Sequence, residues 1–236
     1  MRRVGGGTRR TQLSTPRAFA YKNLFRFEPK TDTILLGLNR YYNKMKILGI
    51  IETIAKKRAE LVVTRVLPYI KYAKKIIDIG CGTGHVTHLL TKHGKKITPV
   101  DISNKNWISA IKPIIYDGKR LPFPDQSFDT SLLLMVLHHT PDPKVVFLEA
   151  ARVGKEVIVI ETVYKYLFDK IVTVLFDSLG NLQPRFYWNS YRRDEDWKTF
   201  FKSVGYKVEA IQCHRDWWFL IPYLHNVYYL KKVNKS

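Results

Sequence analysis

The sequence predicts an α/β fold: a doubly wound, mostly parallel sheet of seven strands whose last strand runs antiparallel, preceded by an N-terminal helical extension. From Lys75 to Glu161, short apolar segments alternate with helical or loop segments, as in repeated β/α units. The first of them, Ile76–Ile79, shows little polar alternation, which is typical of a parallel strand covered on both faces. Two further apolar segments, 206–213 and 226–233, indicate a strand pair added late.

The N-terminal region has two parts. Residues 1–30 combine a run of three glycines with eight lysines and arginines, and we expect a basic, flexible tail. From residue 31 onward, apolar residues recur at three- and four-residue steps, which predicts helix, with two helices between Asn43 and Ile70.

The remaining elements follow in order. We expect strands at 76–79, 96–100, 113–116, 128–134, 156–161, 206–213 and 226–233. Helices are expected at 85–92, 107–111, 143–152, 164–179 and 194–203. The clearest boundaries belong to the helix at 143–152, because Asp142 is a preferred N-cap, Pro143 suits the first turn and Gly154 ends the segment. An aromatic turn region, 216–224, joins the last two strands.

The net charge is +20 and unevenly distributed. Residues 1–75 hold 18 lysines and arginines against 4 acidic residues, whereas residues 76–236 hold 22 against 16. Such clustering suggests an anionic partner: nucleic acid, an acidic membrane surface or an acidic substrate. A solvated basic surface without a specific partner is the alternative, and charge does not decide between them.

Cysteine content and hydropathy suggest a compartment. Only Cys81 and Cys213 occur, which is not the pattern of a secreted disulfide framework. No segment approaches the roughly 20 apolar residues that span a bilayer, and the N-terminal arginines precede no signal-like apolar core. We therefore expect a cytoplasmic protein, with peripheral membrane contact left open. No cysteine or histidine group shows metal-ligand spacing, so we expect no metal site.

A glycine-rich turn follows the first strand: Asp78-Ile79-Gly80-Cys81-Gly82-Thr83-Gly84. A strand, such a turn and a helix form a nucleotide-binding unit, because glycine permits tight turns and the helix N-terminus offers free N–H groups. The phosphate-binding P-loop is excluded, because no Gly-Lys-Ser/Thr is present. The dinucleotide fingerprint is disfavoured, because the third glycine comes one residue early.

Two acidic residues extend the candidate site. Asp101 ends the second strand, where a carboxylate can accept both hydroxyls of a ribose. Asp117 ends the third strand, in position to accept from an adenine amino group. Each alone suits a helix cap or a solvated loop, but acids at three successive strand ends favour a nucleoside-type ligand.

These motifs resemble those of the Rossmann-like, class I S-adenosylmethionine-dependent methyltransferases that modify small molecules and lipids, of the ubiquinone/menaquinone-biosynthesis type. The resemblance covers residues 55–161 and rests on the glycine turn, on Val100-Asp101-Ile102-Ser103, on 116–129 and on Leu137-His138-His139. It implies S-adenosylmethionine as cofactor, a cofactor-binding half at 73–161 after helices at 31–72, and a substrate-side half at 162–236. Residues 31–236 would then form one methyltransferase domain.

The resemblance also implies site residues. The positions matching the family's cofactor motifs are Asp78, Gly80, Cys81, Gly82, Gly84, Asp101, Ile102, Asp117, Gly118, Leu134 and Met135. The glycines would line the methionine and ribose, Asp101 would bind the ribose, and Ile102 would pack on adenine. Asp117 and Gly118 would meet the adenine edge, although only 16 residues separate Asp101 from Asp117, fewer than the family's spacing.

The acceptor is less defined. His138 and His139 are candidate general bases, needed only when the acceptor must lose a proton, and packing in the loop is their alternative role. Aromatic residues in the first helices and after the fifth strand favour a small hydrophobic or lipid-like acceptor, with basic residues near anionic lipid. An RNA methyltransferase and a non-catalytic cofactor-binding protein are the alternatives, and the oligomeric state stays open.

Overall fold

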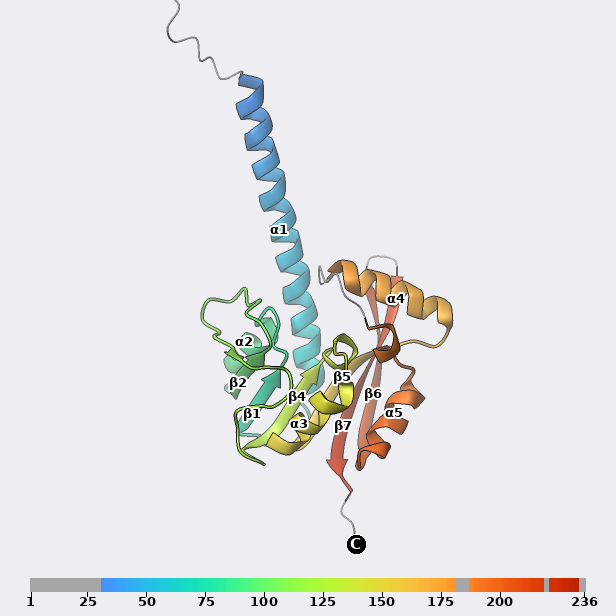
Figure 1. Ribbon diagram of the computed structural model, residues 1–236. Coiled ribbons are helices and arrows are strands. Elements are labelled where there is room, and N and C mark those ends of the chain that lie inside the picture. Colours follow the sequence, from blue (N-terminus) through green and yellow to red (C-terminus); the bar gives the residue numbers. More distant parts are fainter. Residues whose placement is uncertain (1–30, 181–186, 219–220, 234–236) are drawn as a thin grey trace, which may run out of the picture. The chain divides into compact units, whose positions relative to one another are not determined.

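The structure is a computed structural model that describes residues 31–180, 187–218 and 221–233. The chain divides into two compact units, Met1–Ile50 and Ile51–Ser236. The second unit contains the entire sheet (Figure 1). The basic tail expected at residues 1–30 lies outside the described residues.

A seven-stranded sheet organises the second unit, with the strand order β3-β2-β1-β4-β5-β7-β6. The strands are β1 (Lys75–Ile79), β2 (Lys96–Asp101), β3 (Ile114–Ile115), β4 (Phe128–Leu134), β5 (Gly154–Val163), β6 (Tyr206–Trp218) and β7 (Ile221–Lys232). Neighbouring strands from β3 to β5 are parallel, and β7 is antiparallel to both β5 and β6. The predicted doubly wound sheet with an antiparallel last strand is confirmed.

Five α-helices and two short 3₁₀ helices occur in the described residues. They are α1 (Thr31–Val66), α2 (His85–Lys92), α3 (Pro143–Val153), α4 (Leu167–Gly180), α5 (Asp194–Ser203), η1 (Leu137–His139) and η2 (Trp188–Ser190). At α3 the predicted cap is present, because the Asp142 side chain accepts a hydrogen bond from the Lys144 amide at 2.9 Å. No helix in the described ranges combines the length and apolar character needed to cross a membrane.

The prediction of two helices between Asn43 and Ile70 is wrong, because α1 runs without a break from Thr31 to Val66. No proline occurs between those residues, and the first one after them is Pro68. Gly49 lies inside the helix but costs only about 1 kcal/mol relative to alanine, which does not end a helix of this length.

The helix predicted at 107–111 is absent. The Asn106 side chain takes the place of helical bonds, since its amide donates to the carbonyls of Ile108 (2.6 Å) and Ile111 (2.5 Å) and its oxygen accepts from the Ile108 amide. Local side-chain bonds of this kind compete with helix formation. Trp107 is about half exposed, and its ring is in an edge contact with the ring of His85.

The turn predicted at 216–224 is also wrong. Strands β6 and β7 continue toward the tip of the hairpin, with Trp217 paired to Pro222 and Trp218 to Ile221. The segment is rich in aromatic residues, which are enriched in strands, although we predicted a turn from the sequence.

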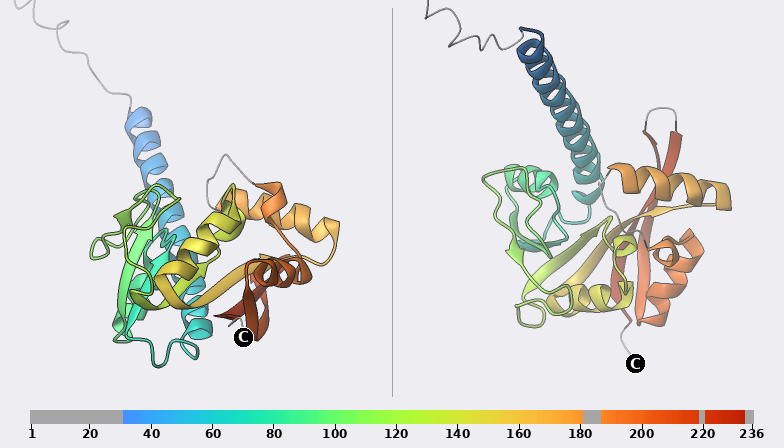
Figure 2. Two further views of the ribbon diagram at one scale, coloured as in Figure 1. Left: turned by 60° about the horizontal axis from the view of Figure 1, so that its bottom comes forward. Right: turned by 45° about the horizontal axis from the view of Figure 1, so that its top comes forward.

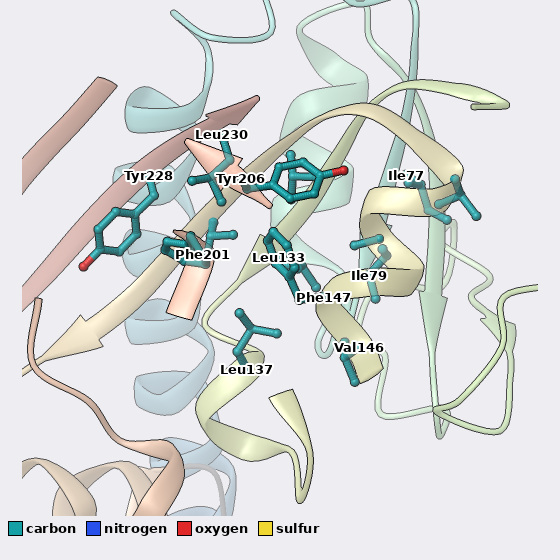
Figure 3. Close-up of a cluster of buried hydrophobic side chains, with 14 of the residues drawn as sticks. Ile77, Ile79, Leu133, Leu137, Val146, Phe147, Phe201, Tyr206, Tyr228 and Leu230 are labelled. Carbon is teal, nitrogen blue, oxygen red and sulfur yellow. The ribbon is translucent and has the colours of Figure 1, made fainter. Parts of the chain in front are cut away.

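Helices cover both faces of the sheet. Helices α3 and α5 lie on one face (Figures 1 and 2), where Phe147 and Phe201 pack against Leu133 and Tyr228 (Figure 3). On the other face, residues 59–66 of α1 and helix α2 pack against alternate residues of β1, β4 and β5, including Leu132. This two-sided burial explains the continuous apolar runs of the central strands and leaves the loops at their carboxyl ends for function.

Candidate functional site

The glycine turn forms a tight loop between β1 and α2. Gly80, Gly82 and Gly84 have φ angles of 77°, 51° and 79°, values that residues with a Cβ adopt only at a cost. Neighbouring side chains also press against the loop. A Cβ on Gly80 would lie 2.7 Å from a Val136 methyl group, and a Cβ on Gly84 would lie 2.2 Å from the Asn106 side-chain oxygen.

Gly82 and Asp101 are in direct contact. The Gly82 amide donates to Asp101 Oδ2 at 2.9 Å, and Asp101 Oδ1 accepts from the Ser103 amide at 3.2 Å. A Cβ on Gly82 would meet nothing closer than 4.0 Å, so this face of the loop leaves room for a ligand. The Asp101 carboxylate is buried and stands at the carboxyl end of β2, where the sequence placed it.

Asp78 lies below the loop. Its carboxylate is buried and accepts a hydrogen bond from the Thr87 hydroxyl of α2 at 2.5 Å. Burial raises the pKa of Asp78 to about 6, although the Thr87 bond opposes the rise. Asp78 therefore ties β1 to α2 and supports the loop from inside the fold.

Asp117, Gly118 and Ile102 form the outer edge of the site. Asp117 is exposed, and its Oδ1 accepts from the amides of Lys119 (2.8 Å) and Arg120 (2.9 Å), bonds that lower its pKa. A Cβ on Gly118 would lie 3.2 Å from a methyl group of Ile102. The Ile102 side chain is exposed, so Ile102 and Gly118 together present an apolar surface beside Asp117.

The carboxyl end of β4 meets helix α1. Leu134 is buried, and Met135 adopts a φ of 60°, which is uncommon for a residue with a side chain. An Arg58 Nη2 donates to Met135 Sδ at 2.9 Å. Arg58 Nε is buried and has no hydrogen-bond partner in the described part of the chain.

A cluster of histidines and carboxylates follows Met135. His138 is fully buried, and its Nδ1 bonds the Glu161 carboxylate at the end of β5. Asp177 of α4 contacts both rings, with Oδ2 3.4 Å from His138 Nε2 and 3.1 Å from His139 Nε2. The Tyr191 hydroxyl donates to the same Asp177 oxygen at 2.6 Å.

The pKa values of His138 and His139 are shifted in opposite directions. Burial alone would lower the pKa of His138, but Glu161 and Asp177 outweigh it and raise the value to about 10. Burial, reinforced by the neighbouring His138 charge, lowers the pKa of His139 to about 3. The surrounding groups therefore favour the protonated form of His138 and the neutral form of His139, whose Nε2 lies 3.1 Å from Asp177 Oδ2.

The comparisons with known proteins agree with this geometry. A family model described as a methyltransferase domain matches residues 77–157. A ubiquinone biosynthesis O-methyltransferase from Idiomarina loihiensis is 28% identical over 95 residues, which cover 36% of this chain and 39% of that protein. A 27-O-demethylrifamycin SV methyltransferase from Amycolatopsis mediterranei is 33% identical over 93 residues, covering 34% of each chain. The chain thus spans about two-fifths or less of the length of these relatives.

Solved structures share the fold. A SAM-dependent methyltransferase from Methanosarcina mazei aligns with a TM-score of 0.53 at 19% identity, covering 68% of this chain and 93% of that one. A magnesium protoporphyrin IX methyltransferase from Synechocystis with bound SAH aligns with a TM-score of 0.54 at 17% identity, covering 75% and 84%.

Residues 77–157 therefore carry a methyltransferase domain, on the fold of the class I, S-adenosylmethionine-dependent methyltransferases. Apart from Cys81, the cofactor residues predicted from the sequence of this methyltransferase domain fall into two groups. The glycine turn, Asp101, Leu134 and Met135 gather at the carboxyl ends of β1, β2 and β4. Asp117, Gly118 and Ile102 lie together along the outer edge, as described above. Cys81 is buried in the loop, and burial raises the pKa of its thiol, so it packs rather than reacts.

Four further residues of the methyltransferase domain were not found from the sequence: Arg58, Glu161, Asp177 and Tyr191. Glu161 ends an apolar strand as Asp101 does, and the same signal would have revealed it. Arg58 lies among other charged residues of α1, and Asp177 is a single acid in the apolar second half of α4. Nothing in their spacing connects them with the cofactor motifs. The sequence also shows no metal-ligand spacing, yet the fold brings one nitrogen or oxygen atom each of His138, His139 and Asp177 within 4.8 Å of one another.

The residues present fit S-adenosylmethionine. Its methionine end carries a carboxylate, and Arg58 offers a guanidinium whose buried Nε lacks a partner in the described residues, beside the Met135 sulfur. A guanidinium is the preferred partner of a carboxylate. The open face of Gly82, next to the buried Asp101 carboxylate, fits a ribose with its two hydroxyl donors.

Proposed function

We propose that this chain transfers the methyl group of S-adenosylmethionine to a hydroxyl oxygen of a small, hydrophobic acceptor. The observation that carries the proposal is the position of His139, which lies shortly after β4, close to the glycine turn, with its Nε2 3.1 Å from Asp177 Oδ2. Val136 packs on Gly80, and the His139 amide donates to the Val136 carbonyl at 3.0 Å. The histidine thus follows the loop that lines the cofactor site.

Each residue has a defined task in this proposal. The bound cofactor supplies an electrophilic methyl group on a sulfonium. Arg58, Gly82 and Asp101 bind and orient it, and alignment of this kind lowers a barrier by up to about 7–11 kcal/mol. His139 accepts the hydroxyl proton of the acceptor, which a neutral imidazole can do and an imidazolium cannot.

Asp177 is a positioning residue for His139. Its Oδ2 lies 3.1 Å from His139 Nε2, which favours the tautomer with the proton on Nε2 and the lone pair on Nδ1. Tyr191 and His138 hold Asp177 ionised, and its pKa lies well below the usual range even though burial acts to raise it. Glu161 in turn orients His138 through a hydrogen bond with Nδ1.

A hydrophobic acceptor is supported by two observations. The matched relatives carry names that refer to a ubiquinone precursor pathway and to a rifamycin. Helix α4, which contributes Asp177, exposes most of an apolar face: Leu167, Ile171 and Leu175 are exposed, and Val174 is buried. Phe168 and Tyr166 are exposed as well.

The same face of α4 supports peripheral contact with an anionic membrane, where a hydrophobic acceptor would dissolve. Phe168 is 74% exposed and Leu167 is 62% exposed, which is costly in water and favourable in a lipid interface. The net charge of +20 favours anionic headgroups.

The test is a labelled-methyl transfer assay with catechol, phenol and quinol acceptors of increasing hydrophobicity. We expect wild-type protein to label the hydroxyl oxygen, and His139→Ala to lose most turnover while it keeps cofactor affinity in calorimetry. Labelling of carbon or nitrogen alone, or full turnover by His139→Ala, would overturn the oxygen acceptor and its base.

Two controls address the alternatives. Total RNA is included as an acceptor, and labelled RNA in the absence of labelled small molecules would favour the RNA methyltransferase. Sedimentation with vesicles of phosphatidylglycerol and of phosphatidylcholine tests membrane contact. We expect binding to the anionic vesicles and weaker binding by Phe168→Ser, and equal behaviour of the two proteins would refute a role for α4.

A further inference from the structure

The cluster of His138, His139 and Asp177 has a second chemical capacity. We propose that these three side chains form a binding site for a transition-metal cation of the Zn²⁺ type. One ligand atom from each residue lies within 4.8 Å of the other two. Asp177 Oδ2 is 3.4 Å from His138 Nε2 and 3.1 Å from His139 Nε2. Ligands of tetrahedral Zn²⁺ at about 2.0–2.1 Å from the ion are separated by roughly 3.3 Å.

The surroundings of His138 are those of a metal ligand. Its Nδ1 is bonded to Glu161, and ligand histidines almost always donate their second ring nitrogen to a carboxylate or carbonyl. Its Nε2 is buried and has no hydrogen-bond partner in the described residues. A buried polar atom without a partner is costly. A cation coordinated at Nε2 would take the place of the proton that Glu161 and Asp177 favour on this ring.

The Asp177 carboxylate is also oriented by a hydrogen bond, as expected of a metal ligand. The Tyr191 hydroxyl fixes its Oδ2, as supporting hydrogen bonds orient ligand carboxylates. A divalent cation bound by Asp177 would also offset the negative charge of Asp177 and Glu161, which the fold places on the two sides of His138 in a site of low exposure. The His139 side chain is 20% exposed, so an ion and one further ligand can approach from its side.

The donor set selects the type of cation. Two imidazole nitrogens and one carboxylate oxygen suit zinc, iron, cobalt, nickel and copper, whereas magnesium and calcium prefer oxygen ligands. A cation with an open position would bind the acceptor oxygen and acidify it. Because the cation would occupy His139 Nε2, it would replace His139 as the group that activates the acceptor. This role rests on the oxygen acceptor of the proposed function, whereas the binding of the cation does not.

The experiment measures binding without turnover. Untagged, metal-free protein is titrated with Co²⁺, which substitutes for Zn²⁺ and reports coordination geometry by its visible absorption. We expect one Co²⁺ per chain with a low-coordinate spectrum, displacement by Zn²⁺, and a rise in the melting temperature with Zn²⁺. A wild-type spectrum of hydrated Co²⁺, or an unchanged melting temperature with excess Zn²⁺, would overturn the site.

Three variants and a matched control locate the ion. His139→Gln and Asp177→Asn should each weaken binding strongly, and Glu161→Gln should weaken it roughly 10–100-fold through His138. His93→Gln, at the exposed end of α2, should bind like wild type. Wild-type affinity in both His139→Gln and Asp177→Asn, each verified as folded by circular dichroism, would refute the assignment whatever the result of the methyl-transfer assay.

Discussion

Arg65 of α1 and Asp216 of β6 form a bidentate ion pair that is buried against the sheet. Arg65 Nη1 lies 2.7 Å from Asp216 Oδ2, and Nη2 lies 2.5 Å from Oδ1. His225 of β7 donates from Nδ1 to Asp216 Oδ2 at 2.8 Å. The three residues join the C-terminal end of α1 to the β6–β7 hairpin, 151 residues further along the chain.

Removal of one partner of this pair should be strongly destabilising. In Arg65→Met the Asp216 carboxylate stays buried beside His225 without its cation, and loss of one partner of a buried pair costs about 3–5 kcal/mol. Urea denaturation measures the change. Lys207→Met, which removes an exposed pair with Glu209, serves as control and should change the free energy of unfolding by less than about 1 kcal/mol. Equal effects would show that the Arg65–Asp216 pair contributes no more than a surface contact.

A side chain at Gly84 should destabilise the protein by a steric clash in addition to the strain of the backbone conformation. Gly84 and Gly94 have φ angles of 79° and 75°, but a Cβ on Gly94 meets nothing within 4 Å. Alanine should therefore cost roughly 1–2 kcal/mol at Gly94. It should cost more at Gly84, because Asn106 is held by Ile108 and Ile111 and cannot yield.

Denaturation and cofactor calorimetry of the two variants separate these effects. Gly84→Ala should also weaken S-adenosylmethionine binding, because the loop must shift, whereas Gly94→Ala should not. A Gly84→Ala protein as stable as Gly94→Ala would show that Asn106 relaxes freely.

The two strand-end acids should contribute unequally to cofactor affinity. Asp101 is buried and touches the glycine turn, whereas Asp117 is exposed and already accepts two backbone bonds. A hydrogen bond to a charged group contributes about 1.5–3 kcal/mol. Asp101→Ala should therefore raise the dissociation constant for S-adenosylmethionine by roughly 10–100-fold or more, and Asp117→Ala by less than about 10-fold. If isothermal titration shows a larger loss of affinity for Asp117→Ala than for Asp101→Ala, the nucleoside binds at the outer edge of the site instead.

Stability should fall in mild acid because of His225. Burial lowers its pKa to about 4, although Asp216 opposes the shift. The unfolded chain takes up a proton near pH 6.5, whereas the folded chain does so only near pH 4, so the contribution of His225 is present above pH 6.5 and is lost as pH falls from 6.5 to 4. The slope approaches about 1.4 kcal/mol per pH unit.

His225→Gln is the matched variant for this effect. It keeps a polar side chain next to Asp216 but cannot titrate. Denaturation at several pH values should give a shallower decline for the variant between pH 6.5 and 4. Parallel curves for wild type and variant would assign the acid sensitivity to other groups.

The fold and the cofactor turn could be predicted from sequence because their signals are local. The apolar runs of β1, β4 and β5 and the cap at Asp142 depend on neighbours in the chain. So does the glycine spacing of Gly80–Gly84, because each backbone angle is set within a few residues. The errors arose where a side chain replaced backbone bonds, as Asn106 does, or where a hairpin extended through aromatic residues, as β6 and β7 do.

The sequence by itself determined the sheet, the methyl donor and the acids at the strand ends, since all of these follow from patterns within single β/α units. Only the tertiary structure decided which of the two histidines is neutral. Asp177, Glu161 and Tyr191 come from three separate elements, and the charge of His138 and His139 depends on their distances and on burial. Electrostatic interactions in a buried site act through space, so their partners leave no spacing in the sequence.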